Sequence, residues 1–379
     1  MRAATPEDHR VHGMGTELEA PTWPAITAGE AAAVLARFPV AGRMTGLHWH
    51  SPRPFSAATL VHTTQGMVLL KRHHHRVRTV EGLAEEHAFI AHLAGAGVSV
   101  PEVLCSDDGA SAVAIGDWSY ELHRQSAGAD LYRDRLSWTP FLSRDHAHAA
   151  GVALAETHVA ARGFDAPARR PQPLVASFRI VSSTDPIAAA SAYVAAHPAL
   201  ARFLADRPWQ AQFTRLLERV DDGLPALLSE QAALWTHNDW HPSNLLWTTD
   251  GRVRTVIDFG LADRTTAVHD IATAIERTAI RWLDRGQGTG PTIADSEAAL
   301  ALLAGYATIA PLGRADIAAI VRVLPVVHLE FALSEIEYFA GVVGDAASAR
   351  MAWDDYLIAH ADWFFSPHGR EFLRRIDEA

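Results

Sequence analysis

The spacing of apolar residues divides the chain into a strand-rich first part and a helix-rich second part. Between residues 46 and 75, three runs with strand-like patterning are separated by a Pro-containing loop and by Gln65-Gly66. This pattern predicts an antiparallel three-stranded meander. Two further strand-like runs follow, at residues 111–116 and 118–125, and the turn residues Gly116-Asp117 separate them.

A helix is predicted between these two groups of strands, over residues 80–97. Its apolar and acidic positions Glu86, Phe89, Ile90 and Leu93 recur on one face of a 3.6-residue period. Two glycines close the segment, as expected at a helix C-terminus.

Changes in the residue pattern also predict the boundaries between the parts of the chain. Residues 1–25 are polar, with Pro and Gly, and we expect a flexible N-terminal tail. Residues 26–123 begin with a helix, because Thr27 and Glu30 have the spacing of a capping box, and then contain the predicted sheet. Residues 124–379 are mostly helical, so the pattern predicts an α+β fold in two lobes.

Composition narrows the class of protein. Apolar residues make up 49% and charged residues 20% of the chain, as in ordinary globular proteins. The net charge of −11 argues against general nucleic-acid binding. The single cysteine, Cys105, permits no intrachain disulfide, and the charged N-terminus lacks the apolar core of a signal peptide. We therefore expect a cytoplasmic protein with no membrane span and no nucleic-acid partner.

The most informative stretch runs from Leu234 to Gly260. Two short apolar runs deliver polar residues at their ends, namely Asp239, Asn244 and Asp258. Oxygen donors of this kind can hold Mg²⁺ on a nucleoside triphosphate, and a carboxylate can take the proton of a hydroxyl group.

These residues resemble those of the aminoglycoside phosphotransferase and choline kinase superfamily. The superfamily motif HxDxxxxN stands here as His237-Asn238-Asp239-Trp240-His241-Pro242-Ser243-Asn244, and its metal motif as Val256-Ile257-Asp258. The resemblance implies a bilobal, protein-kinase-like fold, with residues 26–123 as a nucleotide-binding lobe and residues 124–379 as a catalytic and substrate-binding lobe. One departure is Asn238, where the commoner form of the motif has glycine.

The resemblance also implies roles for the motif residues. Asp239 would face the substrate hydroxyl, and His237 would order the catalytic loop rather than act as a base. Asn244 and Asp258 would hold Mg²⁺. Asp270 would brace the catalytic loop.

In the first lobe the superfamily requires a cation for the nucleotide phosphates. Lys71 stands at the end of a predicted strand and would pair with Glu86, with Glu85 as the alternative in register. Arg72 points to the other face of that strand. The loop of residues 51–56 would cover the phosphates, with Ser56 as a contact, and backbone groups of the connector around Glu121 to His123 would hold adenine.

The resulting hypothesis is an ATP-dependent or GTP-dependent kinase, monomeric or homodimeric, that phosphorylates a hydroxyl of a small molecule such as an aminoglycoside, amino-sugar, sugar or amino alcohol. A Ser/Thr protein kinase and a non-catalytic nucleotide-binding scaffold remain as alternatives. The run His73–His75 is interpreted as a polar strand end rather than a metal site. Acidic residues on the last helices could favour an amine-bearing acceptor if they face the substrate; they are Glu330, Glu335, Glu337, Asp354 and Asp355.

Overall fold

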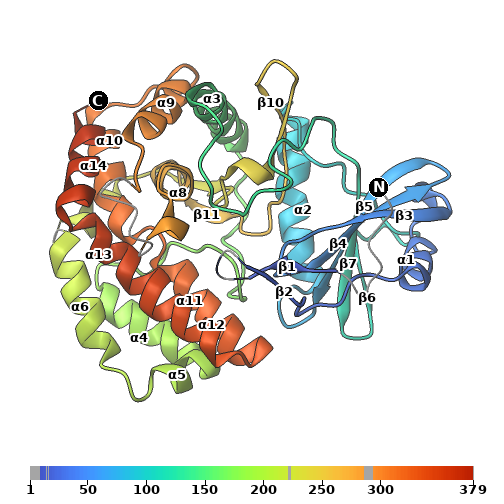
Figure 1. The fold of residues 1–379 in the computed structure, drawn as a ribbon, viewed down its shortest axis with the longest axis horizontal. Helices are drawn as coiled ribbons and strands as arrows, with labels where there is room; N and C mark the ends of the chain where they lie inside the picture. Colours follow the sequence, from blue (N-terminus) through green and yellow to red (C-terminus); the bar gives the residue numbers. More distant parts are fainter. Residues whose placement is uncertain (1–8, 14, 16, 221–222, 286–292, 379) are drawn as a thin grey trace. The chain divides into compact units, whose positions relative to one another are not determined.

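The computed structural model describes residues 9–13, 15, 17–220, 223–285 and 293–378. The strands are β1 Val11–His12, β2 Leu18–Glu19, β3 Met44–His50, β4 Ala57–Thr63, β5 Gly66–His74, β6 Ala112–Ile115, β7 Trp118–Arg124, β8 Ala233–Thr236, β9 Leu245–Trp247, β10 Val253–Val256 and β11 Asp263–Thr266. The α-helices are α1 Ala28–Leu35, α2 Val80–Gly95, α3 Arg144–Ala161, α4 Pro186–Ala196, α5 Pro198–Leu204, α6 Trp209–Val220, α7 Leu224–Ser229, α8 Ala267–Thr278, α9 Ser296–Ala307, α10 Arg314–Val323, α11 Leu329–Glu337, α12 Ala346–Met351, α13 His360–Phe364 and α14 Pro367–Asp377. The chain divides into two compact units, Met1–Gly128 and Ala129–Ala379 (Figure 1).

The first unit is built on one antiparallel sheet of five strands in the order β3-β4-β5-β7-β6. The three-stranded meander and the later pair of strands predicted from the sequence are both present in it. The expected α+β class is confirmed, because this small sheet precedes a mostly helical second unit.

The two faces of this sheet are covered by different helices. Helix α1 begins with the predicted capping box of Thr27 and Glu30, and it packs on the face that carries Leu70 and Leu122. Side chains alternate along a strand, so Lys71 and its neighbours two residues away point to the other face. That other face meets the buried side of α2.

The N-terminal residues differ from the expected flexible tail. Residues 1–8, 14 and 16 lie outside the described part of the chain, but β1 and β2 form a small antiparallel pair. The backbone N–H of His12 donates to Pro52 O at 2.8 Å, and Val11 is buried. This segment is therefore attached to the loop of residues 51–56. The hydrogen bond from His12 and the burial of Val11 hold it there despite its mostly polar composition.

The connector between the units also lies elsewhere than expected. Glu121 and His123 belong to β7, in which Glu121 pairs with Lys71 of β5 on one side and with Ala112 of β6 on the other. Their backbone groups are used by the sheet, so these residues do not form an open connector. The boundary between the units falls after Gly128, rather than after His123.

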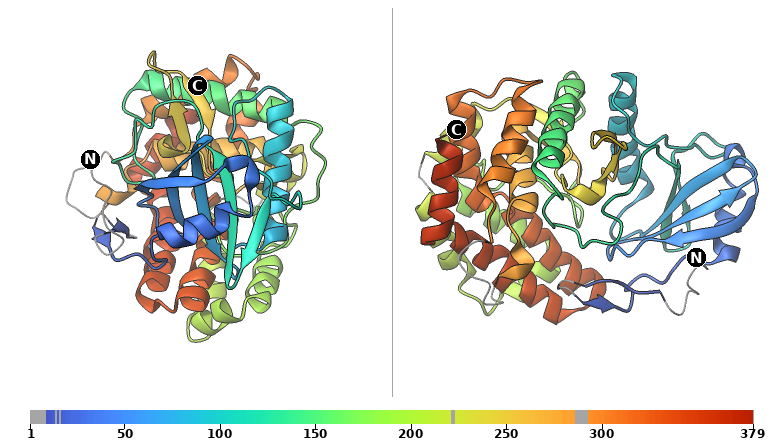
Figure 2. Two further views of the ribbon diagram at one scale, coloured as in Figure 1. Left: turned by 90° about the vertical axis from the view of Figure 1, so that its right-hand side faces the viewer. Right: turned by 45° about the horizontal axis from the view of Figure 1, so that its top comes forward.

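The second unit arranges helices around two short hairpin-like pairs, β8 with β11 and β9 with β10. Helices α3 and α9 lie side by side in it (Figure 2), and their main chains touch at two glycines. A methyl group on Gly151 would lie 1.9 Å from Leu302 O, and one on Gly305 would lie 2.0 Å from His148 O. Only glycine therefore permits this crossing.

One helical stretch of the second unit, Arg314–Val343, is long and apolar enough to cross a membrane, although no membrane span was expected from the sequence. The bent pair of helices Pro186–Ala196 and Pro198–Leu204 is also long and apolar enough if the two are taken together. Within the first stretch, 83% of the most apolar window is buried inside the protein, as in a core helix.

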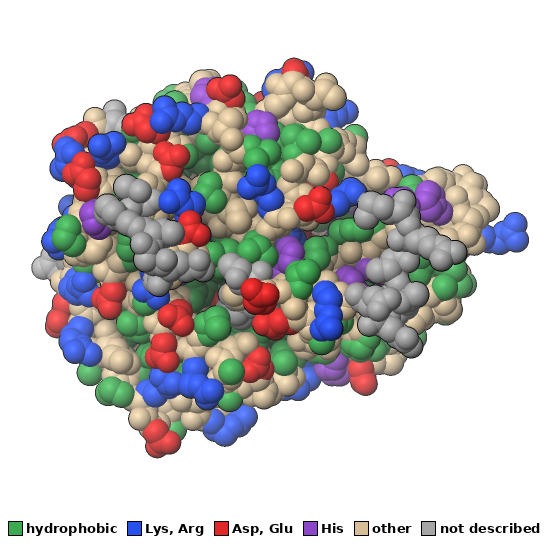
Figure 3. All heavy atoms as spheres, in the orientation of Figure 1, with side chains coloured by type: hydrophobic (Ala, Val, Ile, Leu, Met, Phe, Trp, Pro, Cys, Tyr) green, Lys and Arg blue, Asp and Glu red, His purple; other side chains and the backbone are tan. Residues whose placement is uncertain are grey.

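Among the described residues on the face drawn in Figure 3, acidic and basic side chains are interspersed.

Candidate active site

Backbone pairing brings the two sequence motifs together. Strand β8 delivers His237 to Asn244, and β10 delivers Asp258. The N–H of Ile257 donates to Asn244 O at 2.9 Å, so the end of the first motif lies directly beside the start of the second. The structure therefore brings Asp239, Asn244 and Asp258 into one region, as the spacing of the motifs predicts.

Both motifs contain strained backbone. Asn238 has φ 59° and Asp258 has φ 61°, a left-handed conformation that Asn and Asp tolerate better than most residues. This explains the departure at position 238, since Asn can replace glycine there at moderate cost. The Asn238 Oδ1 also accepts from Thr236 Oγ1 at 2.8 Å and from Thr265 Oγ1 at 3.2 Å, which glycine could not do.

A buried carboxylate holds the strained turn in place. Asp270, on α8, accepts the N–H of Asn238 at 2.8 Å and that of His237 at 2.9 Å. His158 of α3 donates to the same carboxylate at 3.0 Å. Burial opposes ionisation, yet these bonds and the nearby imidazoles lower the pKa of Asp270 below its ordinary value. The bracing role predicted for Asp270 agrees with this geometry.

His237 connects the two motifs. It is fully buried, and burial lowers its pKa although Asp270 opposes the shift. The neutral ring donates from Nε2 to Ile257 O at 3.0 Å and accepts the Asp239 N–H at Nδ1, at 3.2 Å. With both nitrogens used by the backbone, the arrangement favours an ordering role over that of a base.

Asp239 is surrounded by three polar side chains. The Asn244 amide donates to Asp239 Oδ2 at 2.9 Å and to its backbone oxygen at 2.9 Å. His241 Nε2 lies 3.5 Å from Oδ1, and Arg277 of α8 forms an ion pair with the same oxygen. The carboxylate is thus fixed in position and held next to a buried cation.

The donor groups fit a magnesium ion. Both N–H bonds of the Asn244 amide point to Asp239, which leaves its oxygen as the atom that can bind a cation. Asp258 supplies a carboxylate in a turn that Ile257 ties to Asn244. An amide oxygen and a carboxylate are the hard ligands that Mg²⁺ takes beside phosphate oxygens and water.

A cavity adjoins the catalytic loop within the second unit. The empty space among its lining residues is about 250 Å³, which includes open solvent. It is lined by Ala176, Ser177, Asn238, His269, Thr273, Glu276, Arg277, Val327, His328, Phe331 and Tyr356. Because Asn238 precedes Asp239 in the catalytic loop and Arg277 forms an ion pair with Asp239, this cavity reaches the immediate neighbourhood of Asp239.

Two buried carboxyl groups lie near Arg277: Glu276 lines the cavity, and Glu335 lies behind its wall. Glu276 and Glu335 are about 1% exposed, and burial raises the pKa of each to about 8, with repulsion from Glu335 adding to the shift of Glu276. The attraction of Arg277 opposes the shift of Glu335. Both carboxyl groups are therefore mainly protonated at neutral pH, so Arg277 carries the dominant charge of this wall.

The other acidic residues considered for an amine site have structural partners. Glu330 accepts the Ile180 N–H and Glu337 the Leu200 N–H, both at 2.6 Å. Two exposed carboxylates form surface ion pairs: Asp354 with Arg207 and Asp355 with Arg285. Among the described residues, Glu335 is the candidate that interacts with the cavity wall, through Arg277.

In the first unit, Lys71 is buried and its Nζ lies 3.3 Å from Glu121 Oε1. Glu86 is buried on the side of α2 that faces the sheet, whereas Glu85 is only half-buried, so the geometry favours Glu86 in the register. The Lys71–Glu86 pair stays a prediction. Ser56 is half-buried at the end of the loop that precedes β4.

Arg72 points away from Lys71, as expected, and donates to Glu30 of α1 at 2.8 Å.

Sequence reasoning missed Arg277, Glu276 and His241 as parts of the site. Arg277 lies 38 positions beyond Asp239 on a helix with ordinary amphipathic spacing, so no local pattern marks it. His241 lies inside the motif, and its position two residues after Asp239 is the signal that could have indicated a contact.

Comparisons with known proteins agree with this geometry. No curated protein matches the chain. Among solved structures, an aminoglycoside phosphotransferase from Alicyclobacillus acidocaldarius is 17% identical, with a TM-score of 0.54 over 95% of this chain and 97% of that one. A microcompartment-associated aminopropanol kinase is 19% identical, with a TM-score of 0.55 over 90% and 99% of the two chains. Amicoumacin kinase, solved with AMP-PNP, Ca²⁺ and amicoumacin, is 13% identical, with a TM-score of 0.53 over 93% of each chain.

These three structures share the fold, which confirms the expected kinase-like architecture. A family model described as the phosphotransferase enzyme family matches residues 55–312, more than half of the chain and both sequence motifs. The chain therefore belongs to the phosphotransferase enzyme family, whose members are small-molecule kinases.

Proposed function

We propose that the protein transfers the γ-phosphoryl group of Mg²⁺-bound ATP to a hydroxyl group of a small molecule held in the cavity beside Asn238 and Arg277. The observation that carries this proposal is the fixed position of Asp239, between the Asn244 amide and the Arg277 guanidinium. Amicoumacin kinase, a structure of the same fold solved in complex with AMP-PNP, supports the choice of nucleotide.

In this reaction the acceptor oxygen forms a bond to the γ-phosphorus, and the bond to the oxygen bridging the β- and γ-phosphates breaks. Asp239 orients the hydroxyl and takes its proton late, since the loose transition state demands position more than basicity. Asn244 and Asp258 would hold the Mg²⁺, which neutralises phosphate charge when bound. Lys71 would contact the nucleotide phosphates.

The cavity supports a small acceptor. The empty space of about 250 Å³ among its lining residues includes open solvent, so the enclosed part of the cavity is small. Its wall combines the Arg277 cation with the rings of Phe331 and Tyr356 and with the Glu276 carboxyl group. Sugars, amino-sugars and amino alcohols are therefore better candidates than a protein side chain on an extended peptide.

The test is a phosphorylation screen of aminoglycosides, amino-sugars, sugars, amino alcohols and nucleosides, with ATP and GTP in parallel. Asp239→Asn should lower turnover at least about a hundredfold while Mg²⁺-ATP binding, measured by calorimetry, is retained. Asp250→Asn is the matched control, since this exposed carboxylate pairs only with Arg252 among its described ion-pair partners. Unchanged turnover in Asp239→Asn would refute the role of Asp239.

A second variant tests the metal ligands. Asp258→Ala should abolish Mg²⁺-dependent nucleotide binding, and normal binding would place the metal elsewhere. Tight ATP binding with no turnover on any acceptor would favour a scaffold over an enzyme, and labelled protein in a lysate would favour a protein kinase.

A further inference from the structure

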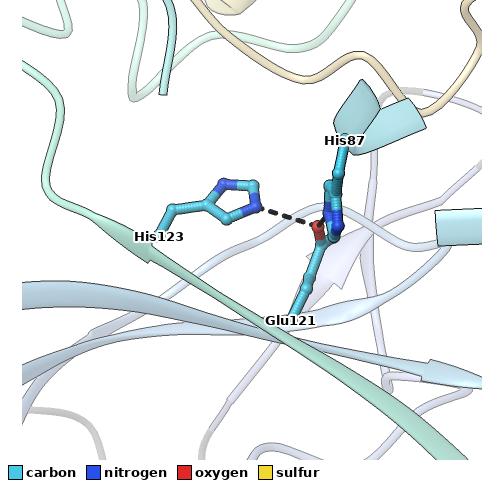
Figure 4. Close-up of side chains that lie close together, drawn as sticks. All are labelled: His87, Glu121 and His123. Atoms are coloured by element: carbon cyan, nitrogen blue, oxygen red, sulfur yellow. Dashed lines mark hydrogen bonds and ion pairs between the residues drawn. The ribbon is translucent and has the colours of Figure 1, made fainter. Parts of the chain in front are cut away.

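A buried carboxylate in the first unit is surrounded by imidazole rings. Glu121 Oε2 lies 2.7 Å from His87 Nε2 and 2.9 Å from His123 Nε2 (Figure 4). Its other oxygen, Oε1, lies 2.9 Å from His73 Nε2 and 3.3 Å from Lys71 Nζ. All five side chains are less than a tenth exposed as residues, so the cluster is screened from solvent.

The fold itself brings these groups together. Strands β5 and β7 are antiparallel neighbours, and Lys71 is paired with Glu121 while Leu69 is paired with His123. Alternation along β7 puts Glu121 and His123 on the same face of the sheet. Helix α2 covers that face and contributes His87, one residue after Glu86.

The nitrogen and oxygen atoms of three of these residues converge on one point. One ligand atom each from His87, Glu121 and His123 lies within 4.8 Å of the other two. Zn²⁺ and similar ions bind imidazole and carboxylate at about 2.0–2.2 Å, so a small movement around a common centre would satisfy all three. Two imidazoles with one carboxylate also form a donor set that selects transition metals over Mg²⁺ or Ca²⁺.

We propose that His87, Glu121 and His123 form a binding site for a divalent transition metal of the Zn²⁺ class, separate from the magnesium site of the second unit. His73 is a positioning residue, because it holds the second oxygen of Glu121 and so orients the carboxylate. The three protein ligands leave a fourth position for water.

Two features limit the affinity of this site. The ammonium of Lys71 also contacts Glu121, so a bound cation must share or take over this carboxylate. In His87, Nδ1 is buried and has no hydrogen-bond partner among the described residues, although a metal-bound ring would carry its proton there. We therefore expect micromolar binding that exchanges readily, rather than a permanent structural metal.

The sequence could not indicate this site, because its ligands come from α2 and β7 and are separated by 34 positions between His87 and Glu121. The histidine run that attracted attention, His73–His75, supplies only His73 to the cluster. His75 is exposed at the strand end, in agreement with the interpretation of that run as a polar terminus.

The experiment uses the full chain without a histidine tag, first treated with EDTA. Zn²⁺ is titrated in competition with a chromophoric chelator, and Co²⁺ is titrated with its visible absorption recorded. We expect one equivalent of each metal, with the intense absorption of four- or five-coordinate Co²⁺. Weak absorption typical of octahedral Co²⁺, or no saturable binding, would overturn the proposal.

Variants then locate the site. His123→Ala and His87→Ala should weaken Zn²⁺ binding at least about tenfold. The controls His62→Ala and His75→Ala, which remove exposed histidines of the same unit, should leave it unchanged. Loss of binding in the controls alone would assign the metal to the surface. Binding is measured without nucleotide, so the result is independent of the proposed kinase activity, and the wild-type Co²⁺ spectrum remains decisive if a variant does not fold.

Discussion

Replacement of Asp270 by asparagine tests whether one buried carboxylate maintains the catalytic loop. Asp270 is fully buried and accepts three hydrogen bonds, from the N–H groups of His237 and Asn238 and from His158. Asparagine has nearly the same shape, but it carries no charge and replaces one acceptor oxygen by a donor. The substitution therefore changes hydrogen bonding while leaving packing intact.

The size of the effect follows from these three bonds. Whichever way the new amide is turned, its NH₂ group faces a backbone N–H, so at least one bond to a charged acceptor is lost, at about 1.5–3 kcal/mol. The other two become neutral hydrogen bonds, each weaker by about 1 kcal/mol. The sum predicts that Asp270→Asn lowers the free energy of unfolding by about 3–5 kcal/mol. Release of Asn238 from its left-handed conformation should also lower kcat at least about tenfold.

Urea unfolding measured by tryptophan fluorescence gives the first quantity, because Trp235, Trp240 and Trp247 are buried around the loop. Asp263→Asn is the matched control: Asp263 is also fully buried and accepts the N–H groups of Arg169 and Arg264. We expect similar destabilisation in both variants, but a loss of kcat per folded molecule only in Asp270→Asn.

The acid side of the stability profile provides a second check. The pKa of Asp270 is lowered in the folded protein, so its ionised form contributes stability above the unfolded pKa of about 4, and this is lost as the pH falls through the folded value. Asp270→Asn should therefore lose less stability than the wild type when the pH falls from 5 to 3, a range of about one unit on either side of the unfolded-state pKa. An unfolding free energy within about 0.5 kcal/mol of wild type at pH 7 would refute the bracing role.

Three further predictions concern other features. Asn238→Gly keeps the left-handed turn and should cost less stability than Asn238→Ala, by about 1 kcal/mol in urea unfolding; equal costs would mean that the conformation is not strained. Burial raises the pKa of both Glu276 and Glu335, and repulsion from Glu335 adds to the shift of Glu276, so ionisation of this pair costs stability as the pH rises from about 4 towards 8. Glu335→Gln should therefore stabilise the protein relative to wild type more at pH 8 than at pH 5, and the reverse trend would contradict the assignment. Gly305→Ala should lower the free energy of unfolding by about 1–3 kcal/mol, because the new methyl group meets His148 O. Gly29→Ala in α1 is the control and should be neutral or stabilising, because there is open space around Gly29. Equal melting temperatures of the two variants in thermal unfolding would argue against the close contact between α3 and α9.

The fold was largely predictable because its elements follow local rules. The meander appears where the period of two and the turn residues are strongest, and Thr27 caps α1 as its spacing with Glu30 indicates. The meeting of the two catalytic motifs was equally predictable, since the order of their polar residues along the chain determines which groups lie side by side.

The remaining parts depend on contacts between distant segments. The contact of Arg277 with Asp239 and the convergence of His87 with His123 on Glu121 join residues whose own neighbours in sequence show no unusual pattern. Glu121 was expected at the connector for a related reason: its sequence does not show that its backbone is paired on both sides, which happens because β6 folds back onto β7.

Asn238 belongs both to the cavity wall and to the strained turn beside Asp239, and this restricts how the preference for an acceptor could be redesigned. Its side chain forms part of the cavity wall, while its N–H and Oδ1 hold the strained turn next to Asp239. A substitution there would change ligand fit and loop geometry together, and the two effects could not be separated in a selection experiment. Libraries aimed at new acceptors should therefore vary Val327 and Phe331 on the wall contributed by the C-terminal helices and keep Asn238 constant.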